Sequence, residues 1–179
     1  LGVRRKGNVQ EIVVKLPRSG PFADTFPFDC PKAQRIHDAV CENLRGEYAR
    51  GGGLRGGPVT NAYAVMGLLG HRSGKYDAVV KPFVMKVAET HAAGSSETSV
   101  WLLSHAGIML CEYYALYPED AVKAGIEAIA KRLAGSIPDH GRYGHHLRPN
   151  RNEIAYDGQG LNATTTAALW FFASAARCG

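Results

Sequence analysis

The residue types best suited to chemistry gather in one polar stretch, residues 141–163, which has the sequence GRYGHHLRPNRNEIAYDGQGLNA. It has neither helical nor strand periodicity, and apolar helical sequence lies on both sides of it. Loops of this length are often functional. We name as candidate catalytic residues Arg142, His145, Tyr156 and Asn162, and as candidate substrate-binding residues Tyr143, His146, Arg148, Arg151 and Gln159.

Together these side chains match the parts needed for β-elimination on an acidic sugar. An arginine can grip a carboxylate through two parallel hydrogen bonds. An imidazole exchanges protons near neutral pH, and a tyrosine can protonate the leaving oxygen or stack on a sugar ring. Asn162 falls in the first turn of the next helical segment, where backbone N–H groups favour an anion.

The same residues also fit a connector that binds nothing. Gly141, Gly144, Gly158 and Gly160 suit turns, and the polar side chains would satisfy one another. Asn162 could simply cap the helix that follows. The sequence leaves both interpretations open.

The sequence lacks the motifs that other kinds of binding or catalytic site require. GGGLRG, residues 51–56, has the letters of a dinucleotide-binding loop, but helical sequence precedes it, so we expect a flexible or closely packed loop. The adjacent His145 and His146 lack the i, i+4 spacing of a helical metal pair, and the four cysteines form no CxxC motif. No Gly-x-Ser-x-Gly nucleophile elbow is present. We therefore expect neither a metal nor a cofactor.

Helical sequence must position this stretch. Segments at about 59–71, 98–117 and 160–177 are apolar on nearly all sides, whereas those at about 76–91 and 119–134 have one apolar face. A helix that is apolar all round must be enclosed, and a striped helix lies outside. The alternation predicts a mainly α fold, an α/α-hairpin array or partial α/α toroid.

A weak internal repeat supports this array. YDAVVKPFVMKVAE and PEDAVKAGIEAIAKRLA align with Asp77 on Asp120, a period of about 43 residues that falls in the range of helical repeats.

The N-terminal part of the chain differs in character. Residues 1–17 predict a short β-hairpin with Gly7-Asn8 at its turn, and the proline-rich residues 18–30 predict a linker. A helix starting at about Pro31 opens the third segment, the α/α-hairpin domain of residues 31–179. The chain begins in mid-strand without an initiator Met, so we expect it to be a piece of a longer polypeptide.

The composition of the chain limits the classes of partner that we expect it to bind. The chain is 45% hydrophobic and 21% charged, as is ordinary for a globular protein. Its net charge of +5 is scattered and forms no basic stripe along a helix, so we do not expect nucleic acid as a partner. No apolar run reaches the roughly 18 to 20 residues that span a bilayer.

The hairpin LGVRRKGNVQEIVVKLP, the segment GPFADTFPFDCPKAQRI and the C-terminal GRYGHH…YDGQGLNATTTAALWFFASAARCG together resemble an uncharacterised bacterial family. Its members join a PDZ domain to an α/α-toroid region of the terpenoid-cyclase-like type. The resemblance implies that residues 1–17 end a PDZ-like domain and that the helices belong to a toroid. It implies no activity, and the chain has no adjacent aspartates of the kind terpenoid cyclisation uses. The YGHH and GQGLN segments look like the family's signature, so the positions to test first are Tyr143, Gly144, His145, Gly160 and Asn162.

Two functions follow as expectations. The first is a non-catalytic structural or binding module for protein or glycan, with other protein chains, further copies of itself or the rest of its own polypeptide as partners. The alternative is a carbohydrate-active enzyme such as an acidic-polysaccharide lyase that uses residues 141–163. Localisation stays open, with an exported or cell-envelope bacterial protein as one expectation.

Overall fold

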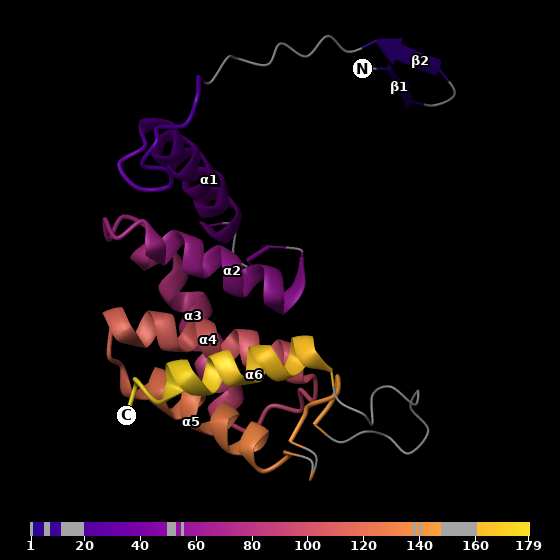
Figure 1. Ribbon diagram of the computed structural model, residues 1–179, viewed down its shortest axis with the longest axis vertical. Helices are drawn as coiled ribbons and strands as arrows, with labels where there is room; N and C mark the ends of the chain where they lie inside the picture. The colour runs from indigo at the N-terminus through magenta and orange to yellow at the C-terminus, as the bar shows by residue number, and fades with distance from the viewer. Residues whose placement is uncertain are drawn as a thin grey trace. The chain divides into compact units, whose positions relative to one another are not determined.

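The computed structural model describes residues 2–5, 8–11, 20–49, 53–54, 56–137, 139, 141–147 and 161–179. The chain divides into two compact units, Leu1–Asp38 and Ala39–Gly179. The elements in chain order (Figure 1) are β1 (Gly2–Arg5), β2 (Asn8–Glu11), α1 (Pro31–Ala49), α2 (Gly57–Gly70), α3 (Asp77–Ala92), α4 (Val100–Leu116), α5 (Asp120–Ala134) and α6 (Asn162–Ala175).

In the first unit, β1 and β2 pair as an antiparallel hairpin. Gly2 lies opposite Glu11, and Arg5 lies opposite Asn8. Asn8, which was expected in the turn, is therefore the first residue of β2. Residues 12–19, which include the rest of the predicted second strand and the start of the predicted linker, lie outside the described residues.

Residues 20–30 fold back against the start of α1. The Lys32 ammonium donates to the Gly20 carbonyl at 2.7 Å and stands 4.1 Å from the centre of the Phe22 ring. Helix α1 begins at Pro31, as the sequence predicts, because a proline in the first turn has no N–H to leave unpaired.

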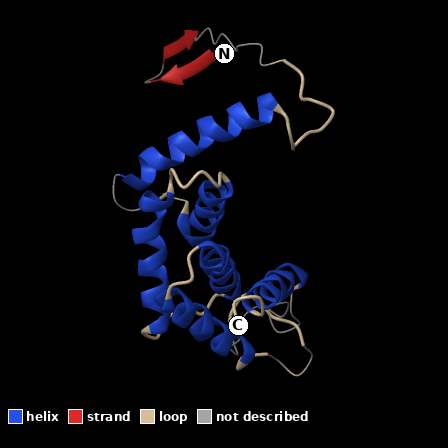
Figure 2. Cartoon of the chain, turned by 90° about the vertical axis from the view of Figure 1, so that its left-hand side faces the viewer, coloured by secondary structure: helices blue, strands red, loops and turns tan. Residues whose placement is uncertain are grey.

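The second unit is helical, as predicted. Helices α2 to α6 begin and end within two residues of the five segments expected from the apolar pattern. In the described part of the chain, strand is confined to the N-terminal hairpin (Figure 2). The fold class is therefore confirmed as mainly α, built from packed helix pairs.

The helices of this unit pack in two rows. Helix α4 packs between α2 and α6 to form one row, and α3 packs on α5 to form the other. Asp77 and Asp120, which the internal repeat aligns, are the first residues of α3 and α5. Helix α5 also packs on α4 and so joins the rows.

Only α4 is enclosed to the degree that the apolar pattern predicts. Eleven of its 17 residues are buried. Helices α2 and α6 lie at the two ends of their row, and each keeps large side chains on its surface, namely Tyr63, Leu169 and Trp170. The prediction of full enclosure was wrong for these two helices because an end position in a row has a neighbour on one side only.

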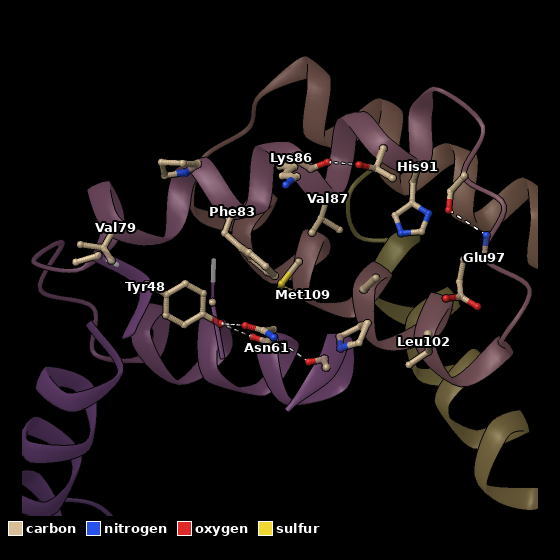
Figure 3. A pocket seen from close by; sticks show the side chains of 18 of the residues that line it. Tyr48, Asn61, Val79, Phe83, Lys86, Val87, His91, Glu97, Leu102 and Met109 are labelled. Atoms are coloured by element: carbon tan, nitrogen blue, oxygen red, sulfur yellow. Dashed lines mark hydrogen bonds between the residues drawn. The ribbon is translucent and has the colours of Figure 1, made fainter. Parts of the chain in front are cut away.

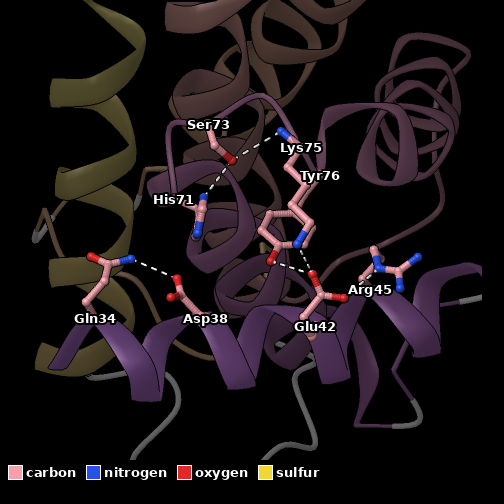
Figure 4. Close-up of polar contacts among 8 residues, drawn as sticks. All are labelled: Gln34, Asp38, Glu42, Arg45, His71, Ser73, Lys75 and Tyr76. Carbon is pink, nitrogen blue, oxygen red and sulfur yellow. Dashed lines mark hydrogen bonds and ion pairs between the residues drawn. The ribbon is translucent and has the colours of Figure 1, made fainter. Parts of the chain in front are cut away.

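Within the second unit, the part of α1 from Ala39 onward is held by Glu42 (Figure 4). Its carboxylate pairs with the Lys75 ammonium, accepts from Arg45 Nε at 3.0 Å, and accepts from the Tyr76 hydroxyl at 3.0 Å. These three hydrogen bonds, that from Lys75 first, lower the pKa of Glu42 from 4.5 to about 2.

None of the described helices combines the length and the apolar character that a membrane span requires.

Candidate functional site

A cavity of about 830 Å³ lies in the second unit between α2, α3 and α4 (Figure 3). Its wall is mainly apolar, and the volume lies within the range of ligand sites. The principal apolar lining residues are Val79, Phe83, Val87, Leu102, Ala106 and Met109. We call this cavity the interhelical groove.

One end of the groove is built around Asn61. This buried side chain accepts from the Tyr48 hydroxyl at 2.8 Å and from Leu54 N at 2.7 Å, and its amide donates to the Leu54 and Gly57 carbonyls at 2.9 and 2.8 Å. All four of its hydrogen-bonding positions are thus used within the protein. Gly53 has a φ of +73°, and a side chain there would overlap the Asn61 amide. The glycine-rich loop is therefore a closely packed element at this point, and its backbone is shaped for Asn61.

The opposite end carries His91, which is 8% exposed. Its Nδ1 atom is buried and has no hydrogen-bond partner among the described residues. Burial, and secondarily the Arg132 guanidinium, lower the pKa of His91 below its usual value of 6.5, while Glu97 opposes the shift. The ring is therefore neutral near pH 7.

The open edge of the groove is more polar. Lys86 is exposed there, and the Thr90 hydroxyl bonds back to the Lys86 carbonyl at 2.7 Å. Pro82 lies within α3 and has no N–H, so the Ala78 carbonyl lacks its helical donor. Ala78 and Pro82 both line the groove.

The predicted stretch 141–163 is anchored by Tyr143, which is buried. Its hydroxyl donates to the Leu133 carbonyl at 2.7 Å, and burial raises its pKa to about 12. Its backbone N–H donates to Thr165 Oγ1, and its carbonyl accepts from Leu161 N and Thr164 Oγ1. Tyr143, named above as a substrate-binding residue, thus joins the end of α5 to the start of α6.

The histidines of the stretch lie beside the start of α4. The carbonyl of His145 accepts from Val100 N at 2.8 Å, and its side chain is exposed. His146 is half-buried, and its Nδ1 lies 3.3 Å from the Thr98 hydroxyl. The two histidines therefore belong to one short segment that pairs with residues 98–100.

Two further predicted catalytic positions are exposed in the structure, Arg142 and the first residue of α6, Asn162. The remaining predicted residues lie outside the described part of the chain: Arg148, Arg151, Tyr156 and Gln159. Among the described residues, no three or more His, Cys, Asp or Glu side chains lie close enough together to hold a metal ion.

None of the groove residues was named from the sequence as a candidate catalytic or substrate-binding residue. Asn61 and His91 lie 30 residues apart and meet the same cavity only because α2 and α3 fold beside α4. The one available signal was an asparagine within the apolar helical segment 59–71, since a buried amide needs partners.

Two rows of packed helices with an apolar groove between them define a helical domain of the paired-helix class. The chain belongs to the family described as "Domain of unknown function (DUF6288)", which matches residues 34–179. Comparison with curated proteins and with solved structures finds no match.

Proposed function

We propose that the second unit is a protein-binding module whose interhelical groove receives the apolar face of an amphipathic helix. The helix would come from another protein chain or from another part of a longer polypeptide. The observation that carries this proposal is the only partly buried apolar stripe of α3 along the groove, formed by Val79, Phe83 and Val87.

The packing of α3 supports a helix as the occupant. One stripe of α3 packs against α5. On it Ala88 contacts Gly125 of α5, and Val80 and Val84 are completely buried. The neighbouring stripe, which includes Val79 and Phe83, is only partly buried and faces the groove. A helix laid there would continue the row of α3 and α5.

The chemistry of the wall favours apolar side chains over sugar hydroxyls. Leu102, Ala106 and Met109 form the α4 side, and the Asn61 amide has no free hydrogen-bonding position. Grooves of this kind bind helices through apolar anchors at i, i+3 or i+4, and i+7. Methionine adapts to the shape of such anchors.

A fluorescein-labelled amphipathic peptide, with leucine and lysine at helical spacing, tests the proposal by fluorescence anisotropy. We expect binding, and a scrambled peptide of equal composition should bind at least about tenfold more weakly. Val79→Asp should weaken binding by about tenfold or more because it places a charge against apolar side chains. The matched control is Ile137→Asp, at an exposed residue outside the groove.

Equal binding of the scrambled peptide, or equal binding by the Val79→Asp and Ile137→Asp variants, would contradict the proposal. Circular dichroism of each variant shows that the helices are intact.

Three finer features form part of the proposal: the two rows belong to an α/α toroid of the terpenoid-cyclase-like type, residues 1–17 end a PDZ-like domain, and the family is bacterial. The alternation of rows supports the first, and the β1–β2 hairpin supports the second. A longer chain containing residues upstream of Leu1 would test the second, since a PDZ-like domain requires further strands.

The acidic-polysaccharide lyase remains a second candidate for residues 141–163. The observation in its favour is that Tyr143 fixes the backbone while Arg142, His145 and Asn162 are exposed around it. Incubation with uronate polysaccharides and absorbance of the unsaturated product test it. Absence of product from the wild-type protein would exclude the lyase and leave the helix-binding proposal untouched.

A further inference from the structure

A second feature lies on the side of α2 that faces away from the groove. Tyr63 follows Asn61 by two residues, which is about 200° around a helix. Its side chain is half-exposed at 49%, and it is the one exposed tyrosine among the residues that the structure describes. Its hydroxyl lies 3.1 Å from Nε2 of His105 on α4, a residue that is 1% exposed.

The bonding of His105 fixes which nitrogen carries the proton. Nδ1 lies 2.8 Å from the carbonyl of Trp101. A carbonyl only accepts, so Nδ1 bears the hydrogen and Nε2 of the neutral ring has a free lone pair. Nε2 therefore accepts the Tyr63 O–H, and the hydrogen-bonded series runs from Tyr63 through His105 to the Trp101 backbone.

This series has the order of an activated nucleophile: a hydroxyl, a base within hydrogen-bond reach, and a third group that orients the base. The surroundings add an aromatic surface, since Trp101 is only partly buried and its ring centre lies 4.4 Å from that of the imidazole. The phenol ring of Tyr63 stands edge-on to the same imidazole at 5.3 Å.

We propose that Tyr63 is a nucleophile activated by His105 and that its substrates are activated aryl esters. The Tyr63 oxygen forms a bond to the acyl carbon, and the bond from that carbon to the aryl oxygen breaks. The phenol proton moves to His105 Nε2 and from there to the departing aryl oxygen. Water then cleaves the acyl-tyrosine by the same proton path, which releases the acid and restores the phenol. Trp101 provides a ring against which the aryl group stacks.

p-Nitrophenyl acetate tests this activity directly. Release of p-nitrophenolate is followed by absorbance, and acetylated peptides are quantified by mass spectrometry. We expect acetylation of Tyr63 to be about tenfold or more faster in the native protein than in the same protein unfolded in urea, although folding halves its exposure. The half-buried Tyr114 is the internal reference and should react faster when unfolded.

Two variants separate activation from exposure. His105→Gln retains an acceptor for the Tyr63 hydroxyl but cannot take up a proton, so acetylation should fall to the unfolded rate. Tyr63→Phe should remove the acetylated peptide altogether. Equal Tyr63 acetylation in wild type and His105→Gln, or a native rate no higher than the unfolded rate, would overturn the proposal. The native-to-unfolded comparison needs no variant and so decides the matter even where His105→Gln does not fold.

Discussion

Gly125 of α5 lies so close to α3 that a methyl group on it would stand 2.8 Å from the Cα atom of Ala88. Real side chains do not approach a backbone atom that closely, so the two helices must separate to admit one. Ala88 is fully buried and Gly125 is buried, so this contact lies in the interior between the two helices of the second row.

Replacing Gly125 by alanine should destabilise the protein by about 1–3 kcal/mol, the usual cost of overpacking. The control is Gly67→Ala in α2, where an added methyl meets nothing within 4 Å. That change should stabilise by about 0.5–1 kcal/mol because alanine favours a helix interior more than glycine does. Urea denaturation measures both, and equal effects of the two substitutions would contradict the packing described for α3 and α5.

Replacing Asn61 by aspartate should destabilise the protein by about 1–3 kcal/mol for each buried group left unpaired. Aspartate keeps the oxygen that accepts from Tyr48 and Leu54 but loses both donations, to Leu54 and Gly57. Tyr48→Phe, which removes a single hydroxyl, should cost about 1 kcal/mol. Thermal denaturation measures the two losses of stability. A smaller loss for Asn61→Asp than for Tyr48→Phe would contradict the hydrogen bonding described for Asn61.

Glu42 should make stability fall at acidic pH. Its pKa is lowered from 4.5 to about 2 in the folded protein by hydrogen bonds from Lys75, Arg45 and Tyr76. A lowered carboxyl pKa stabilises the folded state above the unfolded value, and this contribution is lost as pH falls from about 4.5 toward about 2. Glu42→Gln should therefore show a shallower loss of thermal midpoint across that window. The difference should shrink at high salt because the pair is near the surface.

His91 should affect the stability of the protein in a different pH range, near neutrality. Burial first, and Arg132 second, lower its pKa below 6.5, while Glu97 opposes them. Protonation is therefore harder in the folded state than in the unfolded state, so stability declines as pH falls below about 6.5. His91→Gln cannot titrate, and its thermal midpoint should decline less than that of wild type between pH values just above and just below this point. Parallel curves for the two proteins would rule out this role of His91.

Substitution of Tyr143 should cost more stability than substitution of its exposed neighbours. Tyr143→Phe removes the bond to the Leu133 carbonyl and should destabilise by about 1 kcal/mol. Arg142→Ala and Asn162→Ala change exposed side chains and should alter stability by less than about 0.5 kcal/mol. A larger loss from Arg142→Ala than from Tyr143→Phe, measured by chemical denaturation, would contradict the anchoring role given to Tyr143.

Much of the helical framework could be predicted because it depends on local pattern. The apolar periodicity located α2 to α6, Pro31 marked the start of α1, and the alignment of Asp77 with Asp120 placed two helices in equivalent positions. Each of these signals lies within one segment or compares two segments of the same kind.

The groove and the Tyr63–His105 pair could not be predicted because they depend on contacts between distant segments. Tyr63 and His105 are 42 residues apart, and their hydrogen bond requires a particular register between α2 and α4. The sequence instead predicted a site among the polar residues of 141–163. The structure shows that one of them, Tyr143, uses its hydroxyl and its backbone groups inside the protein.

The contact between Gly107 and Phe171 bears on how far this unit can be divided. A side chain at Gly107 would overlap the fully buried ring of Phe171, so α6 covers the middle of α4 directly. A fragment that stopped after α5 would expose that part of α4 to water and would be prone to self-association. Residues 141–147 form hydrogen bonds both to the start of α4 and to the start of α6. Proteolytic cleavage on either side of this segment should therefore leave the helices associated. We therefore expect the second unit to unfold as one body and its last helix to be required for the burial of α4.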